Sequence, residues 1–234
     1  MFGFYFSPNY LLFMVPAFFL MLAVQLYVRS AYNKWSKVPA RSQIPGREAA
    51  ERLIRAGGLN QVRVEGVRGQ MTDHYDPRTK VLRLSQGVYG GNSVAALAIT
   101  AHELGHAIQD NEGYFPLRFR SAIVPVVNIG SYLGWILIII GMLLQISGIA
   151  WLGLIVFSAG ALFALATLPV ELNASSRAKQ LLVQSGLIVG EEEMRGVNNV
   201  LNAAALTYVA ALITAVLQLL YWATMVLGMG GRRK

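Results

Sequence analysis

The chain has 234 residues, of which 55% are hydrophobic and only 14% charged, and its formal net charge is +8. Soluble domains carry about 25% charged residues, so part of the surface of this protein must face lipid. The positive net charge is then explained by basic residues beside membrane spans, and it does not indicate binding to nucleic acid. The chain contains no cysteine, which excludes disulfides, thiolate metal sites and thiol nucleophiles.

Four stretches without charged residues are long enough to cross a bilayer, which takes about 20 helical residues. They run over Tyr10–Val28, Ala122–Leu144, Ile149–Leu168 and Ala203–Leu227. Basic residues follow the first stretch rather than precede it, so it is interpreted as a retained anchor and not as a signal peptide. Residues 29–120 hold 14 Lys and Arg against eight acids, and the positive-inside rule therefore places this segment in the cytoplasm.

The spans divide the chain into five predicted parts. These are an N-terminal anchor (1–29), a cytoplasmic α+β domain (30–120), a transmembrane helical hairpin (121–170), a cytoplasmic segment (171–202) and a C-terminal transmembrane helix with a basic tail (203–234). If the last span crosses the membrane, the three basic residues at the C-terminus lie outside the cell, which violates the positive-inside rule. Either the short tail crosses regardless, or the fourth segment is tilted or re-entrant.

Short-range patterns predict two helices and three strands in the cytoplasmic domain. Apolar residues at helical spacing predict the helices, and alternation predicts the strands. The residues Asp76–Thr79 have turn chemistry, so the second and third strands should form a β-hairpin. In chain order the elements are expected over Arg47–Ala56 (helix), Gln61–Val67, Met71–Tyr75 and Lys80–Leu84 (strands) and Ser93–Asp110 (helix).

The second helix carries the sequence HELGH, which is typical of a zinc hydrolase. Residues four apart lie on one face of a helix, so His102 and His106 can present their imidazoles to one ion. Zinc suits neutral imidazole and keeps one position for water in a catalytic site. Glu103 follows the first ligand and can act as general base toward that water. We therefore predict one zinc ion per chain, with Glu103 as a catalytic residue.

A catalytic zinc needs a third protein ligand, and Glu171 is the leading candidate. It lies at the predicted cytoplasmic end of the third span, level with the interface that the motif helix must approach. The alternative is an interfacial acid that caps the next helix. The acidic run Glu191–Glu193 is more typical of a solvated helix start than of a ligand set.

Two residues are candidates for stabilising the oxyanion of the transition state. His74 could be a ligand or a transition-state donor, although a role in stabilising the turn is the simpler interpretation. Tyr208, beside Asn202 near the cytoplasmic end of the fourth span, could supply a hydroxyl donor, or it could simply anchor the helix at the interface.

In combination these motifs resemble the YugP-like membrane zinc metallopeptidases, bacterial proteins loosely related to the HtpX and CAAX-prenyl-protease type of gluzincin. The similarity covers almost the whole chain and rests on the segments 73–77, 101–109, 171–175 and 201–208.

The resemblance implies a mostly α membrane protein with four transmembrane helices and a small α+β gluzincin-like core, in which a hairpin lies beside the HExxH helix. In such cores an edge strand, here in the hairpin 71–84, binds the peptide as an added strand. The resemblance also supports Glu171 as the third ligand. The HtpX-type pattern has an Asp four residues after that Glu, where this chain has Ser175, so Asn173 or Ser175 would orient the histidines instead.

The sequence thus predicts a zinc endopeptidase of the bacterial cytoplasmic membrane, acting at the cytoplasmic face on peptides or proteins, membrane proteins among them. One alternative is a site-2-type intramembrane protease, which would need the motif inside a span and an Asp-Gly ligand pair in a later span. The apolar run of the motif helix is too short to cross the membrane, and the sequence has no Asp-Gly pair. Another is a non-catalytic scaffold that keeps a metal site, against which the intact Glu103 argues. The oligomeric state is not predicted.

Overall fold

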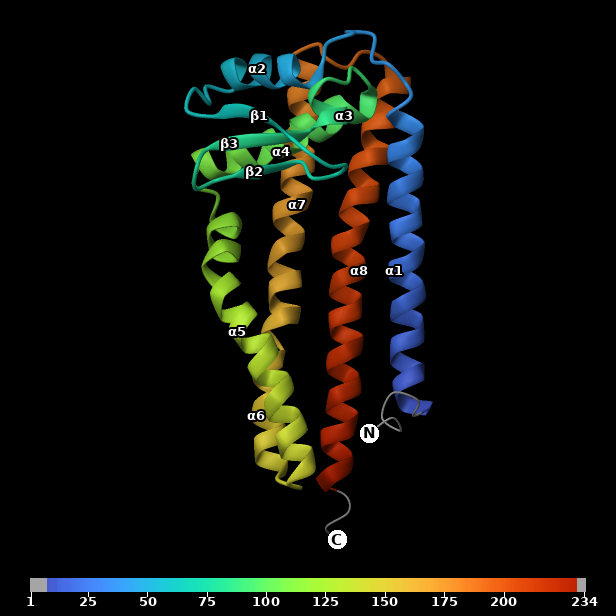
Figure 1. Ribbon diagram of the computed structural model, residues 1–234, viewed down its shortest axis with the longest axis vertical. Helices are drawn as coiled ribbons and strands as arrows, with labels where there is room; N and C mark the ends of the chain where they lie inside the picture. The colour runs from blue at the N-terminus through green and yellow to red at the C-terminus, as the bar shows by residue number, and fades with distance from the viewer. Residues whose placement is uncertain (1–7, 231–234) are drawn as a thin grey trace. The chain divides into compact units, whose positions relative to one another are not determined.

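The computed structural model describes residues 8–230, most of which are helical (Figure 1). The basic tail predicted at the C-terminus falls on residues 231–234, outside the described residues. The elements in chain order are α1 (Pro8–Trp35), α2 (Gly46–Ala56), β1 (Arg63–Val67), β2 (His74–Asp76), β3 (Val81–Ser85), α3 (Gln86–Tyr89), α4 (Val94–Asn111), α5 (Phe115–Leu143), α6 (Ser147–Phe157), α7 (Ala159–Gln184) and α8 (Glu191–Gly230).

Four helical segments of the described chain are long and apolar enough to cross a membrane, which confirms the predicted number of spans. They are Pro8–Trp35, Phe115–Leu143, Ser147–Gln184 and Glu191–Met229. Each is longer than its predicted apolar stretch, because polar residues continue the helices past the hydrophobic windows. The third segment joins α6 and α7, which are separated by one non-helical residue, Ser158.

The described residues form two compact units. The membrane unit comprises residues 8–24, 119–168 and 207–230, and the sheet unit comprises residues 25–118 and 169–206. The sheet unit holds all three strands and the HELGH motif, so it is the unit that positions the candidate site.

The sheet of the sheet unit has the strand order β1-β3-β2. Strand β3 is central, with β1 parallel on one side and β2 antiparallel on the other, so the predicted hairpin is confirmed. Its turn closes because the Asp76 carboxylate accepts the backbone N–H of Arg78 at 2.9 Å and the Thr79 hydroxyl at 2.7 Å. Strand β2 starts at His74 rather than at Met71, because Met71 has φ 55° and cannot continue an extended strand.

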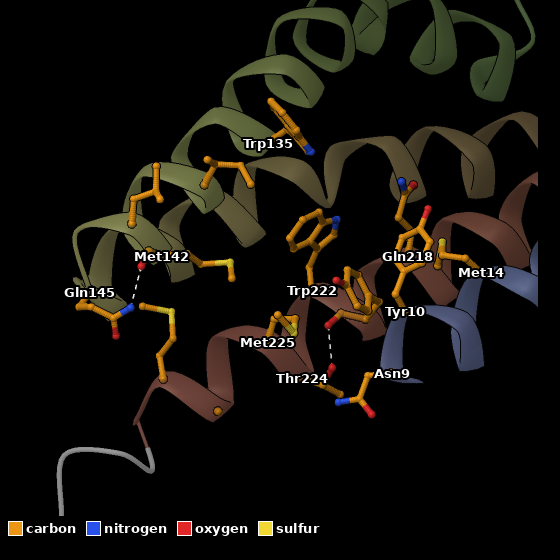
Figure 2. Close-up of a pocket in the computed structure, with 15 residues that line it drawn as sticks. Asn9, Tyr10, Met14, Trp135, Met142, Gln145, Gln218, Trp222, Thr224 and Met225 are labelled. Atoms are coloured by element: carbon orange, nitrogen blue, oxygen red, sulfur yellow. Dashed lines mark hydrogen bonds between the residues drawn. The ribbon is translucent and has the colours of Figure 1, made fainter. Parts of the chain in front are cut away.

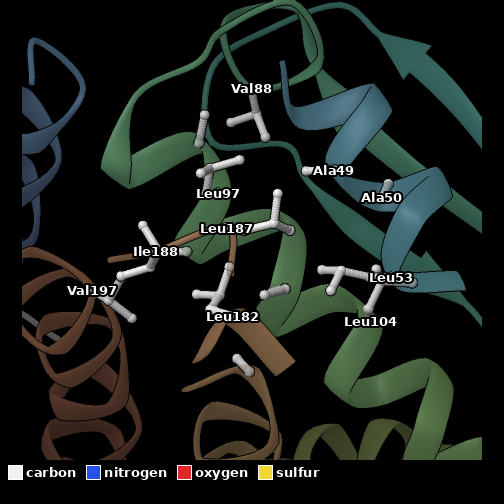
Figure 3. Packing of buried hydrophobic residues seen from close by; sticks show 14 of the residues in the cluster. Ala49, Ala50, Leu53, Val88, Leu97, Leu104, Leu182, Leu187, Ile188 and Val197 are labelled. Atoms are coloured by element: carbon white, nitrogen blue, oxygen red, sulfur yellow. The ribbon is translucent and has the colours of Figure 1, made fainter. Parts of the chain in front are cut away.

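Helix α4 is the centre of the sheet unit. It begins after Ser93, whose hydroxyl accepts the N–H of Ala96 at 3.1 Å and so caps the helix. Its Leu97 and Leu104 are fully buried and belong to one apolar cluster with residues of α2 and α7, such as Leu53 and Leu182 (Figure 3). The apolar face of α4 therefore fixes the helix in place and with it the candidate site described below.

In the membrane unit, α5 and α6 approach closely through glycine. A Cβ at Gly134 would lie 2.5 Å from the backbone nitrogen of Phe157, and one at Gly141 would lie 2.4 Å from that of Ala150. Small residues of this kind let helix backbones meet, which is the usual basis of packing in lipid.

A pocket of about 960 Å³ lies among α1, α5 and α8 of the membrane unit (Figure 2). Aromatic rings form much of its wall, including Tyr10 and Tyr221, whose centroids are 5.3 Å apart in an edge contact. The amides of Gln145 and Gln218 also line it, and none of its lining residues is charged. Its chemistry matches the hydrocarbon environment expected for these helices.

Candidate metal centre

Three side chains from two helices of the sheet unit converge on one point. His102 and His106 come from α4 and Glu171 comes from α7, and their ligand atoms all lie within 4.8 Å of one another. Glu171 Oε2 is 3.3 Å from His102 Nε2 and 3.5 Å from His106 Nε2. The structure therefore brings together the three residues that the sequence analysis selected as metal ligands.

The convergence depends on a close crossing of α4 and α7 at Gly105, which lies between the two histidines. A Cβ at this position would lie 2.5 Å from the carbonyl oxygen of Ala174. Real Cβ atoms essentially never come closer than 3.0 Å to another heavy atom, so only glycine allows this crossing. Because Ala174 follows Glu171 by nearly one helical turn, the same contact brings the carboxylate to the imidazoles.

Each histidine ring is held through its Nδ1 atom, so that Nε2 is the nitrogen turned toward Glu171. His102 Nδ1 is 3.2 Å from the hydroxyl of Ser175, and His106 Nδ1 is 3.0 Å from the side-chain oxygen of Gln109. Of the two residues expected to orient the histidines, Ser175 contacts a ring directly and Asn173 contacts Gln109 instead.

Gln109 was not among the residues predicted to orient the histidines. The signal was present, because residue 109 lies on the same helical face as residues 102 and 106.

Glu103 is anchored to the edge of the sheet. Its Oε2 accepts the backbone N–H of Tyr75, in β2, at 3.0 Å. Burial raises the pKa of the Glu103 carboxyl, while the neighbouring His102 and His106 act in the opposite direction. Tyr75 is fixed in turn, because its hydroxyl donates to Asp110 at 2.7 Å, and burial together with this bond raises its pKa. A held carboxylate with a raised pKa is a competent proton acceptor.

The group fits a zinc ion. Ligands about 2.0–2.1 Å from a tetrahedral zinc lie about 3.4 Å from one another, and the two histidine–carboxylate distances are 3.3 and 3.5 Å. Burial alone would lower the pKa of His106, but the Glu171 and Glu103 carboxylates outweigh it and raise that pKa. Neutral imidazoles with carboxylates, in a chain without cysteine, are a donor set that suits zinc.

The other candidates lie as follows. His74 is exposed in β2, and its Nδ1 donates to the carbonyl of Thr72 at 2.8 Å, which is the contact of a turn-stabilising residue. Tyr208 lies on α8 in the membrane unit, and its role as an oxyanion donor stays a prediction.

The acidic run at the start of α8 was expected to be solvated, and for Glu193 this is wrong. Its side chain is buried, and its two oxygens accept the backbone N–H groups of Arg41 and Val189, at 2.5 and 2.7 Å. Glu193 therefore closes a loop and is not a metal ligand. Its neighbours Glu191 and Glu192 are exposed, as expected.

Comparison with known proteins points to the same chemistry. The profile of the family described as "Putative neutral zinc metallopeptidase" matches residues 10–227. The chain is also 49% identical over 206 residues to the Bacillus subtilis (strain 168) protein named "Putative membrane protease YugP", an alignment that covers 88% of this chain and 91% of the relative. No solved structure matches, so the gluzincin-like character of the core stays a prediction.

Proposed function

Because the chain belongs to the neutral zinc metallopeptidase family, we propose that it is a membrane-embedded zinc endopeptidase that cleaves peptide bonds at the cytoplasmic face of the membrane. The observation that carries this proposal is the convergence of His102, His106 and Glu171 with Glu103 beside them. In this role the first three residues hold one zinc ion and Glu103 is the general base.

When bound, zinc polarises the scissile carbonyl and lowers the pKa of the attacking water. The Glu103 carboxylate accepts the proton of that water and later delivers it to the amide nitrogen that leaves. The N–H of Tyr75 keeps one carboxylate oxygen in place throughout. For His74 to donate to the oxyanion, its Nε2 would first have to gain a proton, because its Nδ1 proton is already engaged with Thr72.

The edge strand β2 is the surface along which the substrate peptide lies. It has β3 on one side only, and it packs against α4, where Glu103 meets Tyr75. A peptide added beside β2 would therefore pass the general base. Helix α4 is not among the candidate spans of the described chain. This supports cleavage in the sheet unit over a site-2-type protease, which would need the HExxH motif inside a span.

The catalytic proposal is tested by comparing the wild type with Glu103→Gln in detergent. Zinc content is measured by mass spectrometry, and hydrolysis is followed with an unfolded protein as substrate. We expect equal zinc in both proteins and hydrolysis only in the wild type, because the substitution removes the proton acceptor and leaves the ligands intact. Equal hydrolysis by both proteins would contradict Glu103 as the general base. No hydrolysis by a zinc-loaded wild type would contradict an enzymatic function and favour the scaffold.

The membrane side is tested with single cysteines, since the chain has none of its own. Arg78→Cys places a thiol on the exposed hairpin turn, and Gly148→Cys places one at the exposed start of α6, just after the turn that follows α5. In intact cells a membrane-impermeant thiol reagent should label position 148 and not position 78. The reverse pattern would place the sheet unit outside.

A further inference from the structure

Gln109 is a buried amide at the place where α4 meets α7. Its side chain is fully buried, and it lies three residues after His106. The amide nitrogen donates to the carbonyl of Val170 at 2.8 Å and to Oδ1 of Asn173 at 2.9 Å. The amide oxygen faces His106 Nδ1 at 3.0 Å. One side chain thus connects a candidate ligand on α4 with the helix that carries the third candidate ligand.

The orientation of this amide is fixed by its partners. The carbonyl of Val170 can only accept a hydrogen bond. Asn173 Oδ1 is also an acceptor, because it receives the Nε–H of Arg177 at 2.8 Å, and an arginine only donates. Both partners therefore require the NH₂ group of Gln109, and a flipped amide would place its oxygen against two acceptors. Arg177 also donates to the exposed Glu112 at 2.7 Å, which holds the guanidinium in place beside Asn173.

The fixed amide decides the tautomer of His106. Because the Gln109 oxygen can only accept, His106 Nδ1 must carry a proton, and in the neutral ring Nε2 therefore carries the lone pair. Nε2 faces Glu171 Oε2 at 3.5 Å, so this nitrogen is the one on the side of the candidate metal site. His102 has no such constraint, since the hydroxyl of Ser175 can either donate to or accept from its Nδ1.

We propose that Gln109 is a positioning residue that locks His106 in the Nδ1–H tautomer and ties it to the helix bearing Glu171, so that Nε2 is preset to bind zinc. The inference rests on the proposed function and deepens it, because it names a residue that orients one of the candidate ligands. Residues that orient metal-binding histidines typically change metal affinity by about 10–100-fold when they are replaced.

The test compares Gln109→Met with a matched control. Methionine keeps the length of the side chain and removes both the donor and the acceptor. The control is Thr100→Val, because Thr100 is equally buried on α4 and its hydroxyl makes no hydrogen bond within the described residues. The measurements are the zinc dissociation constant, by competition with a chromophoric chelator, and the visible spectrum of the cobalt-substituted protein.

We expect Gln109→Met to weaken zinc binding by about 10–100-fold and to change the cobalt spectrum, while Thr100→Val leaves both as in the wild type. Wild-type affinity and spectrum in Gln109→Met would overturn the proposal, and so would an equal loss in the control. A wild type that binds no zinc would instead overturn the proposed function itself.

A second measurement needs no substitution at Gln109, and so it tests the proposed His106 tautomer even if that variant does not fold. The chain has three histidines, and His74→Gln leaves only the two rings of the site. In ¹⁵N-histidine-labelled, zinc-loaded protein, the His106 ring should show a protonated Nδ1 and a metal-bound Nε2. A ring that is bound through Nδ1, or unprotonated there, would contradict the proposal.

Discussion

Replacing Gly105 by alanine should separate the two helices that supply the candidate ligands. The added Cβ would lie 2.5 Å from the carbonyl oxygen of Ala174 and 3.1 Å from its carbonyl carbon and Cα. These are backbone atoms, so no side chain can rotate away, and α4 and α7 must move apart until the shortest contact exceeds 3.0 Å. That movement is larger than the tolerance of about 0.2 Å on metal–ligand distances. Glu171 would therefore leave the reach of the zinc.

Two effects on the metal-free protein oppose each other. Overpacking costs about 1–3 kcal/mol, whereas replacing glycine by alanine inside a helix stabilises it by about 1 kcal/mol. The free energy of unfolding of the metal-free protein should consequently change by less than about 2 kcal/mol. Zinc affinity should fall at least about tenfold, which corresponds to about 1.4 kcal/mol.

The assay measures zinc retained after dialysis against a graded chelator, together with thermal unfolding of the metal-free protein in detergent. The control is Gly148→Ala, another glycine within a helix, where an added Cβ meets nothing within 4 Å. We expect the control to retain zinc like the wild type. If Gly105→Ala also retains zinc with unchanged affinity, the inference that the backbone contact sets the position of the third ligand is wrong.

Three further changes test other parts of the site and the fold. Ser175→Asp places a carboxylate on the Nδ1 side of His102, which should make the ring a stronger ligand and slow the transfer of zinc to a chelator by about tenfold. Glu171→Gln removes the anionic candidate ligand and should leave purified protein with little zinc at normal yield, and stoichiometric zinc would refute its role. Glu193→Ala removes a buried carboxylate that accepts the backbone N–H groups of Arg41 and Val189, and it should lower the free energy of unfolding by about 1–3 kcal/mol. Glu192→Ala at the exposed neighbour should change the free energy of unfolding little, and neither substitution should alter zinc binding.

Most of the chemistry of the site could be predicted, because His102, Glu103 and His106 lie within one helix. The spacing of His102, Glu103 and His106 is a local property, and any helix over these residues places the two imidazoles on one face. The four spans could be predicted for the same reason, since twenty apolar residues in sequence need no tertiary information. Glu171 was predicted from its place at the end of a span, in a chain with few possible ligands and no cysteine.

Contacts between elements could not be predicted, because they depend on how helices and strands pack. The parallel pairing of β1 with β3 joins segments that are not adjacent in the sequence. The burial of Glu193 depends on a loop that contains Arg41, more than a hundred residues earlier in the chain.

By itself, the sequence determined a membrane protein with an HExxH helix and a basic segment on one side of its first span. Only the tertiary structure decided that Gly105 lets α7 reach α4, and that Gln109 faces His106 and Asn173 together. The physical reason is that helical periodicity fixes which residues share a face, whereas the fit of one backbone against another fixes which faces meet.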